Sequence, residues 1–434
     1  MLFRSEMVIG NFEQLIENDT ASTISGTGNR LDHNLFNIPV HANTPMFGTF
    51  LILLNTAIGS GTLMVPYCYK LGVFFSLIVA IVFAVVAYFS MHFMIDAGYY
   101  SKTYDYRGLF AHTFGYNKLW IINTMIFLVQ FGACMIYAHW NGRLMNKLVG
   151  SKNVILGSNT FWIFLISTLC VFPLTLFRTL AKLEKFEMLS SVFIFVIISH
   201  SVYWFIKGVL KEGFDPNHRI KYFDMSSILI NALSVNSMAF NCHINLFPCL
   251  EHLKDCTVRR ARKLAGITIC VSFTLYTTFG LFTYLHLFDN LGTGSALEYY
   301  PKSNYFTFIT IVGVIVTLIM SAPLVIWAAR NSIDHIIWGE NEPSSLRWVL
   351  VGGTIVLLTS ALASTSDNIL LFFDIVGGLF TPTIIFLMPS IFYLKNCPSL
   401  SALQKTGAII IGLFTIIAAV SCTYHAITEI IESF

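Results

Sequence analysis

Eleven stretches of mostly apolar residues alternate with short polar segments along the chain. Their approximate ranges are 46–69, 72–96, 119–146, 158–178, 187–209, 225–250, 265–288, 304–330, 346–365, 369–394 and 406–430. A helix needs about 20 such residues to cross a bilayer. The pattern therefore predicts an all-α integral membrane protein with about eleven spans and its termini on opposite sides of the membrane.

Two of these spans are interrupted at their centres. The first contains the segment Asn55–Gly61, the sixth contains Phe240–Asn245, and Pro66 and Pro248 follow them. An interrupted helix frees backbone N–H and C=O groups that lipid cannot satisfy, so such breaks persist where they line a cavity or hold a ligand. Paired breaks in two halves of a membrane protein indicate the binding site of a transporter.

The first break has the chemistry to hold both ends of an amino acid. Glycine at positions 59 and 61 lets backbone amides turn toward a ligand. The half-helix beginning near Ser60 would offer N–H groups to a carboxylate, while carbonyls of Asn55 to Ala57 would suit an ammonium group or a small cation. The alternative is that the glycines only allow close helix packing. If the amides do bind the carboxylate, we expect replacement of Gly61 by a branched residue to abolish ligand binding.

The second break places polar side chains deep in an apolar segment. Asn241 and His243 lie among Ile, Leu, Ala, Phe and Met residues, and polar groups at membrane depth usually face the bundle interior or a cavity. Phe240 offers a ring that could close over a bound ligand. The alternative for His243 is a hydrogen-bonded structural histidine.

Composition and charge agree with a multi-pass membrane protein. Hydrophobic residues make up 55% of the chain and charged residues only 11%, too apolar for a soluble domain. The first 44 residues are polar and predict a flexible tail. A cytoplasmic N-terminus puts 17 of the 26 lysines and arginines inside, as the positive-inside rule expects. The basic run Arg259–Lys263 contributes most and would attract anionic lipid.

Several functional classes lack their motifs. The spans contain no paired aspartates, no Ser-His arrangement and no HExxH, so we do not expect an enzyme. No GxxxxGK[ST] loop is present, which argues against an ATP-driven pump. The nine cysteines show no metal-binding spacing. We expect no cofactor, no metal, no nucleotide and no nucleic acid, with an amino acid and membrane lipid as the partners of a monomer.

Five motifs carry a resemblance to a known family. They are Asn55–Pro66, the stretch Gln130–Tyr137, Leu183-Glu184-Lys185-Phe186, the run Ala239–His243 with Pro248, and Phe279-Gly280-Leu281-Phe282. In this order, over roughly residues 45–430, the chain resembles the amino acid/auxin permease family. Within it, the chain is similar to the system A/N neutral and the vacuolar amino-acid transporters. The Asn-Cys-His triplet is the most specific motif.

The resemblance implies a LeuT-like fold and a function. Spans 1–5 (about 46–209) and 6–10 (about 225–394) would be inverted repeats, helices 1 and 6 would be unwound, and residues 406–430 would add an eleventh helix. The protein would move small neutral L-amino acids by alternating access. By position, the resemblance assigns the substrate to Ala57, Gly59, Ser60, Gly61, Tyr137, Phe240, Asn241 and His243.

The coupling ion is left open by the sequence. The resemblance to sodium-coupled members implies an ion site with Asn55 and Ile58 in the first span and Ser321 in the eighth. Thr317 lies one turn before Ser321 on the same helix face. Hydroxyl and carbonyl oxygens suit a hard cation, although such hydroxyls also bond their own backbone.

Proton coupling would need an intramembrane titratable group. Asp374 is the candidate relay, and the alternative is a carboxylate that reaches water near the outer end of span 10. His139 and His200 are further titratable groups at apolar positions. The membrane also stays open, plasma membrane or vacuole and lysosome. A nutrient receptor that uses the same fold and reports through its 44-residue tail is the competing function.

Overall fold

The computed structural model describes residues 44–150, 154–177, 181–212, 220–339 and 341–432. The predicted tail, residues 1–44, lies outside this part except for Thr44. The described ranges contain no β-sheet, and an isolated bridge joins Thr44 to Leu253. The prediction of an all-α protein is therefore confirmed.

Helices follow the apolar stretches of the sequence. The first half contains α2 (Met46–Ala57), η2 (Ser60–Met64), α3 (Val65–Cys68), η3 (Tyr69–Leu71), α4 (Val73–Ser101), α5 (Tyr106–Phe114), η4 (Tyr116–Lys118), α6 (Leu119–Val149), α7 (Asn159–Ile166), η5 (Ser167–Val171), α8 (Phe172–Thr175) and α9 (Ala181–Glu212). The second half contains α10 (Ile228–Ala239), η6 (His243–Asn245), α11 (Leu246–Glu251), α12 (Val258–Leu287), η7 (Phe288–Asn290), η8 (Ala296–Tyr299), α13 (Tyr305–Trp338), α14 (Ser345–Ala363), α15 (Ile369–Ile375), η9 (Val376–Phe380), η10 (Thr383–Leu387), α16 (Met388–Asn396) and α17 (Ala402–Glu432).

Long helices supply most of the predicted spans. Of the described residues, eight helices are long and apolar enough to cross a membrane, and the pair formed by 46–57 and 61–71, bent by 55°, makes up to nine. The remaining two predicted stretches are the shorter helix Asn159–Thr175 and the interrupted pair α10 and α11. The interruption of the sixth span was predicted, whereas the fourth span is shorter than its predicted range of 158–178.

Side-chain caps mark several helix starts. Asn304 Oδ1 accepts from the amides of Phe306 and Thr307 at the start of α13, and Ser344 Oγ accepts from Arg347 N at the start of α14. Such caps satisfy amides that have no intrahelical acceptor. π-helical turns interrupt span 10 at η9 and η10, and such turns are frequent at functional sites.

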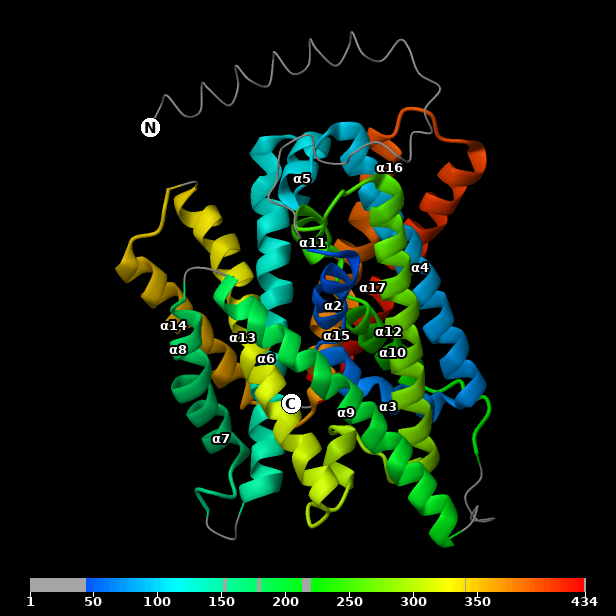
Figure 1. Ribbon diagram of the computed structural model, residues 1–434, viewed down its shortest axis with the longest axis vertical. Helices are drawn as coiled ribbons and strands as arrows, with labels where there is room; N and C mark the ends of the chain where they lie inside the picture. Colours follow the sequence, from blue (N-terminus) through cyan, green and yellow to red (C-terminus); the bar gives the residue numbers. More distant parts are fainter. Residues whose placement is uncertain (1–43, 151–153, 178–180, 213–219, 340, 433–434) are drawn as a thin grey trace.

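The two broken spans lie antiparallel along their length. At one end Thr44 N donates to His252 O and Lys254 N donates to Thr44 O, at 3.2 and 3.0 Å. At the other end Val73 N donates to Lys221 O at 2.9 Å, and Asp224 N donates to Leu71 O at 2.7 Å. The start of the first span thus meets the end of the sixth span, and the end of the first span meets the start of the sixth. Figure 1 shows both at the centre of the bundle, between α4 on one side and α7, α8 and α14 on the other.

Candidate functional site

The two breaks touch each other through their backbones. A Cβ atom built on Gly61 would lie 2.6 Å from Ala239 N and 2.7 Å from Ala239 Cα. Real side-chain atoms do not approach backbone atoms this closely, so position 61 admits no residue larger than glycine without a backbone shift. Gly61 therefore allows the two breaks to pack closely, and this contact neither supports nor excludes a role in ligand binding. A substitution there disturbs packing whether or not Gly61 contacts a ligand, so it cannot test binding by itself.

One tyrosine of α12 joins the two helix ends. The phenol oxygen of Tyr276 lies 2.7 Å from Ala57 O and 2.7 Å from Ala239 O. Ala57 and Ala239 are the last residues of α2 and α10, where carbonyls lack the usual helical amide partner. A phenol has one proton to donate, so it serves one carbonyl at a time. Tyr276 was not predicted from the sequence, where its only signal is a polar group in an apolar span.

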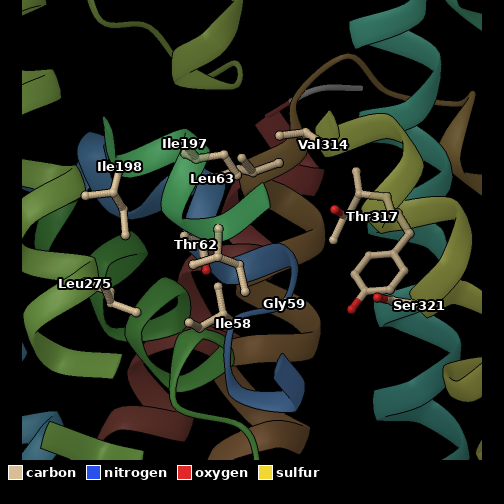
Figure 2. A pocket seen from close by; sticks show the side chains of 13 residues that line it. Ile58, Gly59, Thr62, Leu63, Ile197, Ile198, Leu275, Val314, Thr317 and Ser321 are labelled. Carbon is tan, nitrogen blue, oxygen red and sulfur yellow. The ribbon is translucent and has the colours of Figure 1, made fainter. Parts of the chain in front are cut away.

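A cavity lies beside the first break. Its walls come from the break and from α6, α9, α12 and α13 (Figure 2). The lining residues are Ile58, Gly59, Thr62, Leu63, Tyr137, Ile194, Ile197, Ile198, Leu275, Val314, Thr317, Leu318 and Ser321. The cavity volume is about 30 Å³, whereas one water needs roughly 10–15 Å³ on this scale. In this conformation the cavity has room for two or three waters only, and an amino acid would require the walls to move apart.

Several residues that the sequence predicted for the site meet in this cavity. A Cβ atom on Gly59 would point at Tyr137, 3.2 Å from its Oη, with no other atom that would resist it within 4 Å. Thr317 and Ser321 line the opposite wall (Figure 2). Thr317 Oγ1 donates to Gly313 O at 2.9 Å. Its oxygen still has lone pairs to offer a cation.

The second break lies outside the cavity lining. Phe240 and His243 are fully buried. The ring of Phe240 packs edge-on against Tyr276 at 5.3 Å, and that of His243 packs edge-on against Phe386 at 5.9 Å. Asn241 is half-buried and does not line the cavity. In this conformation the second break contributes backbone contact and packing, rather than the opposite wall that the resemblance implies.

The rest of the predicted set lies close to the break. Ala57 and Asn55 are buried in the last turn of α2. They do not line the cavity, although Ile58, the next residue after Ala57, does. The side chain of Ser60 lies outside the described residues.

The lining is uncharged. It contains no Asp, Glu, Lys or Arg. The isoleucines of α9 and the residues Leu275 and Val314 form an apolar wall that the sequence analysis did not assign to the site. An apolar wall with a few hydroxyl groups fits a small uncharged side chain. A buried charge would have no partner among the lining residues.

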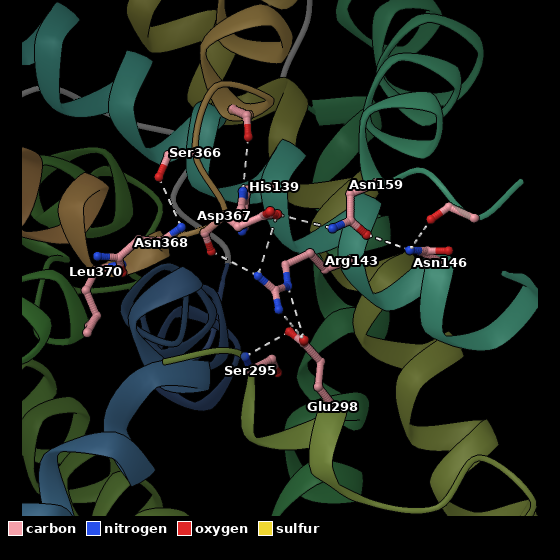
Figure 3. A network of polar contacts seen from close by, with 12 residues as sticks. His139, Arg143, Asn146, Asn159, Ser295, Glu298, Ser366, Asp367, Asn368 and Leu370 are labelled. Carbon is pink, nitrogen blue, oxygen red and sulfur yellow. Dashed lines mark hydrogen bonds and ion pairs between the residues drawn. The ribbon is translucent and has the colours of Figure 1, made fainter. Parts of the chain in front are cut away.

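A polar network ties one end of α6 to the loop that carries η8. Arg143 donates to Glu298 Oε2 from Nε at 3.1 Å and from Nη2 at 2.8 Å, and Nη1 donates to Asp367 O at 2.9 Å. Glu298 Oε1 accepts from Ser295 N at 3.0 Å, which completes a capping box (Figure 3). Because η8 contacts η2, this network holds a loop against the segment that follows the first break.

The titratable groups outside the cavity have defined partners. Asp374 is completely buried, so the interpretation that it reaches water is wrong. Its Oδ2 accepts from Asn231 Nδ2 at 2.6 Å. His139 Nδ1 lies 3.1 Å from Ala363 O, and His200 Nε2 lies 3.0 Å from Thr307 Oγ1. The two histidines thus bridge neighbouring spans.

Comparison with solved structures shows the fold. A mutant form of a manganese transporter of Eremococcus coleocola matches with a TM-score of 0.53 at 12% identity, over 89% of this chain and 94% of that chain. The same transporter with a bound bis-isothiourea compound gives a TM-score of 0.52 at 13% identity, over 90% and 91%. The expected LeuT-like fold is confirmed.

Comparison with known sequences shows the family. A "Putative sodium-coupled neutral amino acid transporter 11" of Rattus norvegicus is 27% identical over 79% of this chain and 76% of its own length. A "Sodium-coupled neutral amino acid symporter 2" of Danio rerio is 23% identical over 83% and 78%. The family described as "Transmembrane amino acid transporter protein" matches residues 42–428. The resemblance and the expectation of a non-enzyme are confirmed, and the chain belongs to the transmembrane amino acid transporter family.

Proposed function

We propose that this protein is a secondary active transporter that couples the movement of small neutral L-amino acids to a sodium gradient. The observation that carries the proposal is the uncharged cavity between the first break and α13, which brings Gly59 and Tyr137 together with two hydroxyls. Relatives named as sodium-coupled neutral amino acid transporters cover most of the chain. The family itself supports the amino acid as substrate.

In this proposal the first break binds the backbone of the substrate. The amides of Gly59, Ser60 and Gly61, at the positive end of the half-helix, would hold the carboxylate. Tyr137 Oη faces Gly59 across the cavity and is placed to donate a hydrogen bond. The apolar wall of α9 and α12 would take the side chain. Residues of the second break, Phe240, Asn241 and His243, would join when the cavity widens.

The proposed sodium site lies between the end of α2 and α13. Sodium requires oxygen ligands. The hydroxyls of Thr317 and Ser321 line the cavity on the side facing Ile58. The carbonyl oxygens at the end of α2, which ends at Ala57, would supply the remaining ligands. One bound ion would link a helix of the broken pair to α13.

Coupling follows from this geometry. The cavity is too small for an amino acid as described, so substrate must bind a conformation in which the broken pair has moved away from α6, α9 and α13. A cation that contacts both α2 and α13 favours the conformation in which these two helices lie close enough to share it. Movement of the central pair against its surroundings is the alternating-access mechanism of inverted-repeat transporters.

The test is uptake of labelled alanine into proteoliposomes under an inward sodium gradient, and separately under a proton gradient without sodium. We expect accumulation with sodium only. In Ser321→Ala the sodium concentration for half-maximal uptake should rise at least about fivefold, about 1 kcal/mol of lost ion binding. Thr310→Val is the matched control, because Thr310 is a buried hydroxyl of α13 that bonds Phe306 O and does not line the cavity.

Three outcomes decide against parts of the proposal. Uptake with protons alone refutes sodium coupling. Equal sodium dependence in Ser321→Ala and the wild type refutes the ion site. Alanine binding to the purified protein without uptake under either gradient favours a nutrient receptor.

A further inference from the structure

The extra helix α17 carries a second polar cluster, outside the cavity. Asp374 of α15, His425 and Glu429 of α17 each offer one ligand atom, and these three atoms all lie within 4.8 Å of one another. His425 and Glu429 are four residues apart, the spacing that places two side chains on one helix face. The sequence does not reveal this cluster, because Asp374 lies more than 50 positions from the other two residues along the chain.

The cluster is short of positive partners. Asp374 is completely buried, and its Oδ1 has no hydrogen-bond partner. Glu429 Oε2 is also buried without a partner. Two neighbouring carboxylates in a membrane-spanning bundle are costly unless a cation neutralises them. Each carboxylate thus keeps one buried oxygen without a hydrogen-bond partner, and a bound cation would satisfy both oxygens.

We propose that Asp374, His425 and Glu429 form a binding site for a divalent transition-metal ion of the Zn²⁺ type. Imidazole nitrogen and carboxylate oxygen are zinc ligands at about 2.0–2.2 Å, so two ligands of a tetrahedral ion lie about 3.3 Å apart. His425 Nδ1 lies 3.3 Å from Asp374 Oδ2. The ligand atom of Glu429 lies within 4.8 Å of the other two, so its side chain would move inward by less than about 2 Å to reach that spacing. Three protein ligands leave the fourth position to water.

A residue of the second broken span orients one ligand. Asn231 of α10 donates to Asp374 Oδ2 at 2.6 Å. Hydrogen-bonded partners of this kind fix the orientation of a metal ligand. The neighbouring packing is tight as well, because a Cβ atom on Gly378 of η9 would lie 2.4 Å from Cys422 Cβ of α17. A bound ion would therefore clamp α17 to α15 and, through Asn231, to α10.

The clamp has a consequence that rests on the proposed function. If the broken pair moves during transport, an ion that fixes α10 against α17 slows the cycle. We expect micromolar Zn²⁺ to inhibit sodium-driven alanine uptake in the wild type, and His425→Gln to be insensitive to it. Inhibition of equal strength in both proteins, or full activity of the zinc-loaded wild type, overturns the clamp.

The site itself is tested without transport. Purified full-length protein in detergent, stripped with EDTA and desalted, is titrated with ZnCl₂ by calorimetry and with CoCl₂ by visible absorption. We expect one Zn²⁺ per chain, at least about tenfold weaker binding in Asn231→Ala, and the intense bands of tetrahedral Co²⁺. His425→Gln and Glu429→Gln should lose the binding, while MgCl₂ should give none.

Controls separate a built site from adventitious binding. His252→Gln removes an exposed histidine elsewhere and should bind zinc as the wild type does. Melting temperatures without metal show that each variant is folded, and Glu429→Gln remains informative if His425→Gln fails to fold. No zinc binding, or equal affinity in wild type and both ligand variants, overturns the proposal whatever the uptake assay shows.

Discussion

Substitution of Gly59 provides the sharpest test of the substrate site. Substitution of Gly61 cannot serve, because any side chain there would collide with the backbone of Ala239. A methyl group at position 59 would enter the cavity, 3.2 Å from Tyr137 Oη and free of other contacts within 4 Å. The φ of Gly59 is −97°, a value that L residues adopt. Gly59→Ala should therefore fold normally, with a change in melting temperature within about 2 °C.

The expected functional loss is large. The methyl group takes the space in which a carboxylate would meet the backbone amides, and pushes the Tyr137 hydroxyl by a few tenths of an ångström. Losing a single charge-assisted hydrogen bond costs about 1.5–3 kcal/mol. That corresponds to roughly a 10- to 150-fold higher alanine concentration for half-maximal uptake. Uptake kinetics in proteoliposomes at saturating sodium measure this directly.

Two further variants separate steric effects from binding. Gly61→Ala places its Cβ 2.6 Å from Ala239 N, and overpacking of this kind costs about 1–3 kcal/mol of stability. It should lose both melting temperature and uptake, whereas Gly59→Ala should lose uptake alone. Tyr137→Phe removes the hydroxyl that the methyl group would contact. The difference in uptake between Tyr137→Phe alone and the Gly59→Ala/Tyr137→Phe double variant therefore isolates the loss that belongs to the amides. Wild-type uptake kinetics in Gly59→Ala would refute the assignment of the first break.

Other contacts give independent predictions. Tyr276→Phe leaves the carbonyls of Ala57 and Ala239 without their 2.7 Å donor, which should cost about 1–3 kcal/mol and appear as a lower melting temperature; an unchanged value contradicts the proposed link between the helix ends. Glu298→Gln removes the charge from the pair with Arg143. It should speed hydrogen exchange at residues 291–300 about fivefold, for about 1 kcal/mol, and unaltered exchange means that the pair does not hold the loop. Gly352→Ala would place a Cβ 1.8 Å from Arg330 Nη2 and should destabilise the protein by at least about 1–3 kcal/mol, which a thermal melt can check.

The sequence alone determined the architecture at low resolution. Long apolar runs predict membrane helices because lipid leaves the backbone no other partner than itself. The same physics makes an interruption such as residues 55–61 conspicuous, so the position of the first break could be anticipated. Its proximity to Tyr137 and Ser321, which both line the cavity, was implied only by the family resemblance. The order of motifs along residues 45–430 was enough to identify the family that the match over residues 42–428 confirms.

Only the tertiary structure decided which surfaces meet. Gly61 touches Ala239 across 178 positions of chain, and Tyr276 reaches both helix ends from a third span. His243 faces Phe386 in the packed interior rather than the cavity, and Asp374 lies against Asn231 and His425 rather than water. An apolar face of a membrane helix can pack against lipid or against another helix. The apolar pattern in the sequence therefore says little about which helix will be its neighbour. Partner choice depends on close packing and on pairing buried polar groups, and these exist only once the helices are assembled.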